Sequence, residues 1–166
     1  MAKNAEKNTA KKIEKKPGSV PENAPPGLFI NAQYLKDLSF ENPNPIDAYQ
    51  TTEKPDIKVN VNTTVKKLPN NSFEVTLDIK TEAKKKEKVA FIAEVSYAGI
   101  FTLNKIPTDQ EKPLLLIEAP RMLFPFARNV LAETTRDGGY PPLMLNPIDF
   151  STLYQKQMAS QQQNQK

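Results

Sequence analysis

The chain has 166 residues and a formal net charge of +4, and it contains neither cysteine nor histidine. The lack of cysteine excludes disulfides and thiolate zinc sites, and the lack of histidine removes the commonest general acid–base group and the commonest metal ligand. We therefore expect a protein that is not an enzyme, holds no metal or other cofactor and works in the cytoplasm.

Residues 1–27 form a lysine- and proline-rich leader without periodic apolar residues, which predicts disorder. The leader holds six lysines and three glutamates and so supplies most of the net charge. Such a tail could contact nucleic acid, a ribosome or anionic lipid, but it has no arginine and no aromatic residue, which favours a solubilising role. No apolar run matches a signal peptide or the ~18 apolar residues of a membrane span, so insertion into a membrane is not expected.

From Leu28 the chain alternates between apolar and polar residues, the pattern of strands with one apolar face. Three further strands alternate over residues 57–65, 73–81 and 89–97. Short polar connections between the four strands predict an antiparallel meander. In the first strand the prolines of residues 42–45 mark the end, Lys36 is a break, and the apolar parity holds Leu28, Ile30, Ala32, Tyr34, Leu38 and Phe40.

A helical period replaces the alternation after Pro120 and predicts a helix over roughly residues 122–136. Pro125 is expected near the start of this helix, where a missing amide proton is tolerated. The run Asp137-Gly138-Gly139 is expected to end it.

A short final helix is predicted near residues 151–159, with Asp149 or Ser151 as its cap, and the glutamine-rich tail 160–166 is expected to be disordered. The fold class is therefore α+β: a four-stranded antiparallel sheet followed by a long and a short helix, in one domain over residues 28–159. Two helices are too few to cover the apolar face of the sheet. Only 38% of the residues are hydrophobic, so the private core is modest and association between copies of the chain is favoured.

The five glycines form no phosphate-binding pattern, so use of ATP is not expected. Carboxylates such as Asp78 and Glu82 lie on a predicted solvated face and show no catalytic pairing. The apolar parities of the second and fourth strands have two interpretations, either core and subunit contact or the lining of a groove for extended apolar chains. These residues are Ile57, Val59 and Val61 on one strand and Phe91, Ala93 and Val95 on the other.

Three blocks of sequence, in order along residues 28–154, are similar to the SecB family of protein-export chaperones. The first is LKDLSFENPN at residues 35–44. The second is AFIAEV at residues 90–95 with GIF at 99–101. The third is LFPFAR at residues 123–128, continued by TRDGGYPPL at 135–143 and PIDF at 147–150.

The resemblance implies a cytoplasmic homotetramer, a dimer of dimers in which two eight-stranded sheets enclose helices and peptide-binding grooves run along the sides. It also implies an ATP-independent holdase that keeps unfolded precursor proteins competent for translocation and delivers them to the SecA motor. Carried over by motif, the residues that bind SecA are Asp37, Glu41, Ile92 and Glu94. The parities agree, since Asp37 and Glu41 share one face of the first strand, and Ile92 and Glu94 share the polar face of the fourth.

Two other functions remain open. A SecB-like chaperone dedicated to one antitoxin would bind few clients, and a basic-tailed nucleic-acid or ribosome-associated protein would bind in a strongly salt-dependent way. Nucleic acid is not the expected partner. SecB proteins are usually acidic, whereas this chain is basic overall, with Lys84, Lys85, Lys86 and Lys88 beside the fourth strand.

Overall fold

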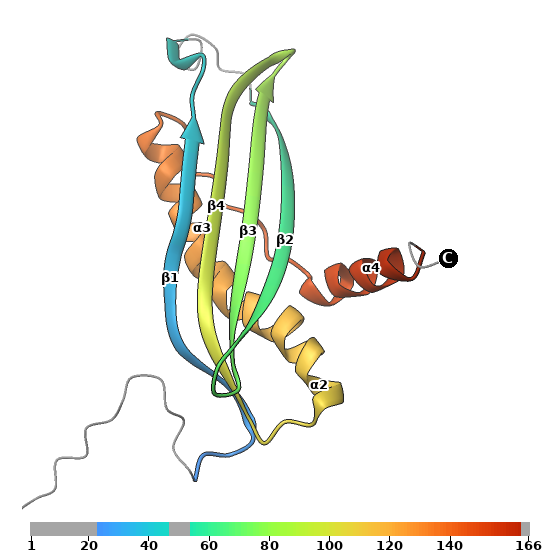
Figure 1. The fold of residues 1–166 in the computed structure, drawn as a ribbon. Helices are drawn as coiled ribbons and strands as arrows, with labels where there is room; N and C mark the ends of the chain where they lie inside the picture. The colour runs from blue at the N-terminus through green and yellow to red at the C-terminus, as the bar shows by residue number, and fades with distance from the viewer. Residues whose placement is uncertain (1–22, 47–53, 164–166) are drawn as a thin grey trace, which may run out of the picture.

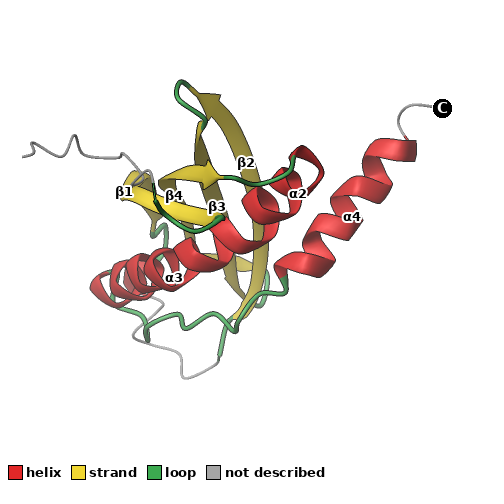
Figure 2. Cartoon of the chain, turned by 90° about the horizontal axis from the view of Figure 1, so that it is seen from below, coloured by secondary structure: helices red, strands yellow, loops and turns green. Residues whose placement is uncertain are grey.

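The computed structural model describes residues 23–46 and 54–163, which form a curved sheet with helices packed on one face (Figures 1 and 2). Most of the predicted leader, residues 1–22, and residues 164–166 of the predicted tail lie outside the described residues. Disorder in both segments therefore stays a prediction.

Four antiparallel strands make the sheet, which confirms the predicted fold class, in the order β1-β4-β3-β2. Their bounds are β1 Gly27–Glu41, β2 Asp56–Leu68, β3 Ser72–Lys85 and β4 Lys88–Asn104. One detail of the prediction is wrong, because only β2, β3 and β4 form a meander, whereas β1 pairs with β4. The physical reason is the connection over residues 42–55, which is longer than a hairpin loop and has Pro43 and Pro45 near its start, so β1 is free to pair at the far edge.

The faces of β1 change twice along the strand, because register shifts occur between Ile30 and Ala32 and between Leu35 and Asp37. Each shift inserts one unpaired residue, Asn31 or Lys36, and turns the following side chains to the opposite face. The single apolar parity predicted for β1 is therefore wrong in its middle. Ala32 and Tyr34 point to the face away from the helices, since their partners Ile100 and Ala98 do. Lys36 was predicted as a break and does lie at the second shift.

The chain after β4 is helical earlier than predicted. Helix α2, Thr108–Pro113, leads through a π-helical turn, Leu114–Glu118, into α3, Ala119–Asp137. The first turn of α3 holds Pro120, and Pro125 lies in the interior of the helix rather than near its start. The predicted stop is confirmed, since α3 ends at Asp137 and Gly139 has a positive φ of 87°.

The final helix, α4, spans Phe150–Gln163 and extends past the β2 edge of the sheet (Figures 1 and 2). Of the two predicted caps, Asp149 fills the role. Its carboxylate accepts hydrogen bonds from the amides of Ser151 and Thr152 at 3.0 and 3.1 Å and from the Thr152 hydroxyl at 2.7 Å. The helix includes the first four residues of the segment that was expected to be a disordered tail.

The core lies between α3 and the middle of the sheet, where side chains of β3 and β4 face the helix. Its largest fully buried side chains include Leu77, Ile79, Phe101, Leu123 and Leu131. Burying each of these contributes roughly 1.5–3 kcal/mol. Among the described residues, no helix is both long and apolar enough to cross a membrane.

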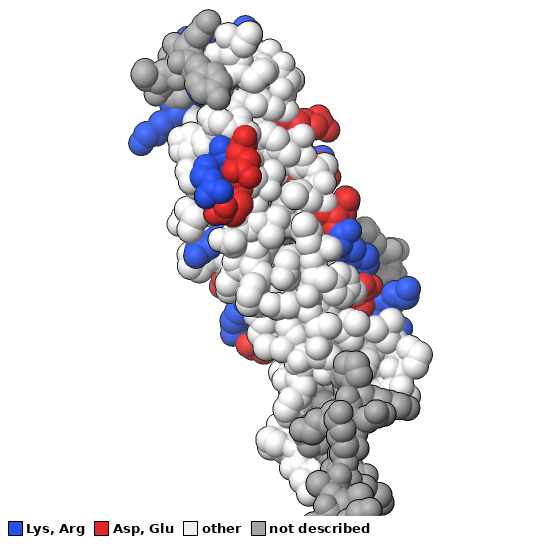
Figure 3. All heavy atoms as spheres, turned by 90° about the vertical axis from the view of Figure 1, so that its left-hand side faces the viewer, with Lys and Arg blue, Asp and Glu red and all other residues white. Residues whose placement is uncertain are grey.

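Besides Ile46 and Met144, large apolar side chains are exposed on two strands and on α3 itself. They are Ile30, Leu35 and Leu38 on β1, Val59 and Val65 on β2, and Met122 and Phe126 on α3. The side of the molecule on which β1 lies carries charges only in small groups of mixed sign (Figure 3). The single chain therefore has the apolar surplus that the sequence predicts.

Candidate functional site

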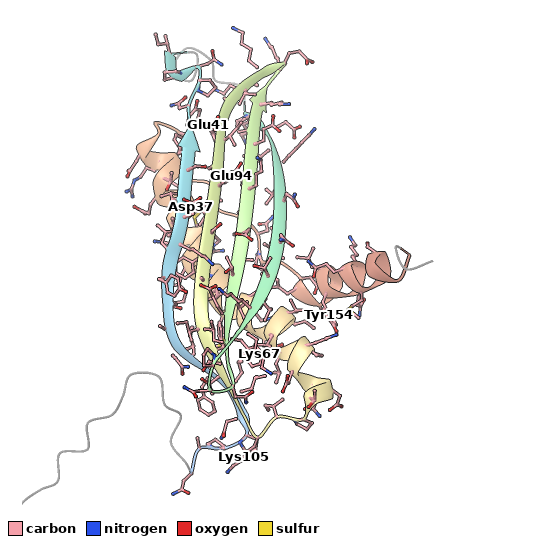
Figure 4. All side chains as sticks on the ribbon, viewed as in Figure 1. Asp37, Glu41, Lys67, Glu94, Lys105 and Tyr154 are labelled. Carbon is pink, nitrogen blue, oxygen red and sulfur yellow. The ribbon has the colours of Figure 1, made fainter. Side chains whose placement is uncertain are left out.

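The four residues expected to bind SecA lie together on the outer face of the sheet, the face away from the helices. Glu41 is the direct cross-strand partner of Ile92, and Glu94 and Asp37 pair with Ser39 and Ser96 in the next two rows. Direct partners in an antiparallel pair share a face, so all four side chains point the same way. Asp37, Glu41 and Glu94 occupy the same half of the sheet in Figure 4.

A polar hollow of about 210 Å³ continues this face across β3 and β2. In it, the Ser96 hydroxyl donates to Asp78 at 2.5 Å, and Lys80 forms an ion pair with Glu94. Sequence reasoning did not select the residues from β3 and β2, although counting the register outward from the β2–β3 turn would have placed them there. The polar lining consists of Asp37, Asn60, Asn62, Asp78, Lys80, Glu94 and Ser96.

The carboxylates of this face are not equivalent. The hydrogen bond to Glu94 raises the pKa of Lys80, so the ammonium stays charged and offsets the charge of Glu94. Within the described part of the chain, Asp37 makes neither a hydrogen bond nor an ion pair. Asp37 therefore presents an uncompensated negative charge on the same face of the sheet as the half-buried Ile92.

Further along the outer face, Tyr34 bridges β1 to β3 by reaching over β4. Its hydroxyl donates to Glu74 at 2.5 Å, and Lys36 lies 3.1 Å from the other oxygen of the same carboxylate. The hydrogen bond to Glu74 raises the pKa of Tyr34 to about 12, while the hydrogen bonds from Tyr34 and Lys36 lower the pKa of Glu74. The bridge passes over the small side chain of Ala98, the β4 partner of Tyr34.

On the inner face, the apolar residues predicted for a groove or a subunit contact fall into two groups. Phe91, Ala93 and Val95 are buried in the core. Val59 is exposed at the open edge of β2, and Ile57 and Val61 beside it are half-buried. Only the residues of β2 are accessible to a ligand or a partner chain in this arrangement.

An apolar hollow of about 400 Å³ adjoins β2, β3 and the helices. Helix α4 forms one wall and is held near β2 by a hydrogen bond of 3.3 Å from Gln157 to Asn62. The helical segment over residues 108–118, which the sequence did not predict, forms the opposite wall, so the hollow was also missed. Its lining consists of Val65, Phe73, Glu111, Lys112, Leu115, Leu116, Tyr154, Gln157 and Met158.

Among the described residues, no cluster of three or more aspartate and glutamate side chains is placed to hold a metal ion. Both surfaces have the chemistry of binding sites, one polar and acidic, the other apolar.

Residues 21–161 match the family model described as preprotein translocase subunit SecB. The protein-export protein SecB of Afipia carboxidovorans is 48% identical over 143 residues, 86% of this chain and 89% of that protein. SecB of Rhodopseudomonas palustris strain TIE-1 is 46% identical over 147 residues, 88% of this chain and 94% of that protein. SecB of Zymomonas mobilis is 48% identical over 136 residues, 82% and 83% of the two chains.

A solved structure has a similar fold, the SecB-like chaperone of Mycobacterium tuberculosis in complex with a peptide from an antitoxin. It aligns with a TM-score of 0.59 and 17% identity over 73% of this chain and 90% of that one, which shows the fold alone. The match to the family model and the close relatives carry more weight, and both cover most of the chain. This protein therefore belongs to the SecB family, which consists of protein-export chaperones and not of enzymes.

Proposed function

We propose that this chain is an ATP-independent holdase that binds extended apolar segments of unfolded precursor proteins in the cytoplasm. The observation that carries the proposal is the apolar hollow beside the open edge of β2. A folded protein hides the apolar side chains and free backbone groups that such a surface binds, so the surface would select unfolded chains.

The edge of β2 has one row of backbone groups without a partner strand in the sheet. An extended client segment can pair with this row, and the backbone hydrogen bonds give tolerance for different sequences. Val59 and Val65 would contact alternate client side chains, and the hollow has room for a large one. Each contact is weak, but a long client that reaches several such edges in an assembly gains avidity.

The test measures how far the chain, at a stoichiometric ratio to a reduced precursor and without ATP, slows the refolding of that precursor. Val65→Asp puts a charge into the lining of the hollow, and Thr64→Asp puts the same charge on the adjacent exposed residue of the outer face. We expect Val65→Asp to retain the client about tenfold less well, a change of roughly 1.4 kcal/mol, and Thr64→Asp to act like wild type. Equal retention by both variants would show that clients bind elsewhere.

Delivery to SecA is the second part of the proposal, with docking on the outer face through Asp37, Glu41, Ile92 and Glu94. The support is the combination of an uncompensated carboxylate at Asp37 with a half-buried apolar side chain at Ile92 on one face. Charge pairs at an exposed interface mainly set the association rate and its dependence on salt.

We predict that Asp37→Lys weakens SecA binding by about tenfold at low salt and that the difference shrinks at high salt. Asp109→Lys makes the same charge change on the exposed surface of α2 and should leave SecA binding unchanged. Calorimetric titration at two salt concentrations measures both. Equal loss in the two variants would mean that net charge alone, and not this face, governs the interaction.

The homotetramer is the third part. The uncovered side chains of β1 and of α3 need partners, and a dimer of dimers with the helices between two sheets would cover them. A function limited to one antitoxin is not favoured, because the relatives that are nearly half identical are protein-export proteins. Nothing in the described residues favours nucleic acid as the partner.

A further inference from the structure

The end of β1 that carries Glu41 is held by residues on the opposite side of the sheet. Glu41 lies between Phe40, whose side chain points toward the helices, and Asn42, the first residue after the strand. Both neighbours contact the loop that follows α3. The block of sequence that contains Glu41 thus meets the block that ends α3, although about a hundred residues separate them.

Asn42 and Tyr140 form a hydrogen-bonded group at this point. The Asn42 side-chain amide donates to the Gly138 carbonyl at 3.0 Å. The Tyr140 hydroxyl lies 2.8 Å from the Ala90 carbonyl and 3.0 Å from Asn42 Oδ1, so its single proton is shared between β4 and the end of β1. Tyr140 is buried, which strengthens these hydrogen bonds.

Aromatic rings pack closely beneath the hydrogen-bonded pair Asn42 and Tyr140. The rings of Phe40 and Phe91 stack at 5.8 Å, and Phe91 contacts Tyr140 at 4.8 Å. A Cβ on Gly138 would lie 2.3 Å from Cζ of Phe40, so the glycine is required for space, since its φ of −73° is open to any residue. The backbone on both sides of Glu41 is therefore fixed.

We propose that Asn42 and Tyr140 are positioning residues for SecA docking, which hold Glu41 at a fixed place beside its cross-strand partner Ile92. This inference rests on the docking face proposed above. An edge strand that ends at a proline is prone to fray, and the hydrogen bonds of Asn42 prevent this at the last residues of β1. Asp37, in the interior of the same strand, does not depend on them.

The test combines Asn42→Ala with two changes on the docking face, in the full chain in its native assembly. Asn42→Ala alone should weaken SecA binding by about fivefold while client retention stays as in wild type. In a Glu41→Gln background it should cause no further loss, because it acts through Glu41. In an Asp37→Asn background the fivefold loss should persist.

A general destabilisation would lower binding equally in both backgrounds and would overturn the inference, as would unchanged binding by Asn42→Ala. Tyr140→Phe keeps the ring on Phe91 and removes only the hydroxyl. It can therefore replace Asn42→Ala in the same experiment if that variant folds poorly. Its expected effect has the same dependence on Glu41.

Amide hydrogen exchange separates failure of this inference from failure of the docking proposal. Asn42→Ala should speed exchange over residues 40–44 and leave the centre of β1 unchanged, whatever binds to the face. If Glu41→Gln binds SecA as wild type does, the docking proposal fails and the role assigned to the two residues fails with it. If Glu41→Gln weakens binding but exchange is unchanged in Asn42→Ala, only the positioning is wrong.

Discussion

At the scale of single residues, the hydroxyl of Tyr34 has the clearest consequence for stability. It is the donor that connects the edge strand β1 to β3 through Glu74. The pKa of Tyr34 rises from 10.0 to about 12, so its contribution is complete below pH 10 and is lost as the pH rises toward 12. The pKa of Glu74 falls below 4.5, so its contribution is present above that pH and is lost on acidification.

We predict that Tyr34→Phe lowers the free energy of unfolding by about 1 kcal/mol near pH 7. The difference from wild type should shrink between pH 10 and pH 12 and again as the pH falls below 4.5. Urea unfolding across this pH range measures the free energy of unfolding of both proteins. Groups that titrate alike in both proteins cancel in the difference between them. Tyr154→Phe is the control, because it removes a hydroxyl that makes no hydrogen bond to any described residue. It should leave the free energy of unfolding unchanged across the pH range.

At the scale of elements, helix α4 depends on its cap, because over residues 150–160 only Phe150 is buried and Leu153 is half-buried. The hydrogen bonds from Thr152 and Ser151 lower the pKa of Asp149, so the cap is complete above pH 3.8 and weakens as the pH falls below that value. Since α4 is a wall of the apolar hollow, the cap also maintains the hollow.

Asp149→Ala should fray the first turn of α4, seen as faster amide exchange over residues 150–154 with exchange in the sheet unchanged. Asp149→Asn keeps an oxygen acceptor and should restore most of the protection. Wild type should approach the behaviour of Asp149→Ala only as the pH falls through the lowered pKa of Asp149, below 3.8. Equal exchange in all three proteins at neutral pH would show that packing alone holds the helix.

The elements also show what the sequence can predict. Strands β2, β3 and β4 alternate without interruption over most of their length and were predicted, as was the end of α3 at its glycines. The register of β1 was not predicted. One inserted residue such as Asn31 turns the following side chains to the other face of the sheet, and the apolar and polar residues of the strand give no sign of it. Residues 108–118 were missed because prolines 107, 113 and 120 obscure a helix that is stabilised by packing against the sheet. The four residues proposed for docking share a face as predicted, because Asp37 and Glu41 both follow the second bulge and no further shift separates them.

At the scale of the whole molecule, the exposed apolar residues limit how a single chain can exist in water. Phe126 is 46% exposed on α3 and stacks on Tyr97 at 6.1 Å, so its ring is half-covered by its own chain. Exposed apolar area of this kind, continued on β1, is characteristic of a subunit interface. The same area would promote aggregation if no partner covered it.

We predict that Phe126→Glu shifts the proposed tetramer to a smaller species, since a charge would be buried at the proposed interface without a partner. Phe126→Leu keeps the apolar contact and should remain tetrameric. Native mass spectrometry, over a range of chain concentrations, distinguishes these states. A tetramer of unchanged stability in Phe126→Glu would show that this side of α3 faces solvent in the assembly.

The two bulges of β1 give the free edges of the sheet different selectivities for a further strand. Along β2 the register runs from Asp56 to Leu68 without a shift, so any regular strand can stay in phase with its donors and acceptors. Along β1 the phase is reset at Asn31 and at Lys36, and an ordinary strand loses its match after a few residues. Only a strand with compensating irregularities fits the full length. The β2 edge can therefore pair with strands of many sequences, whereas the β1 edge excludes regular strands from pairing along its full length.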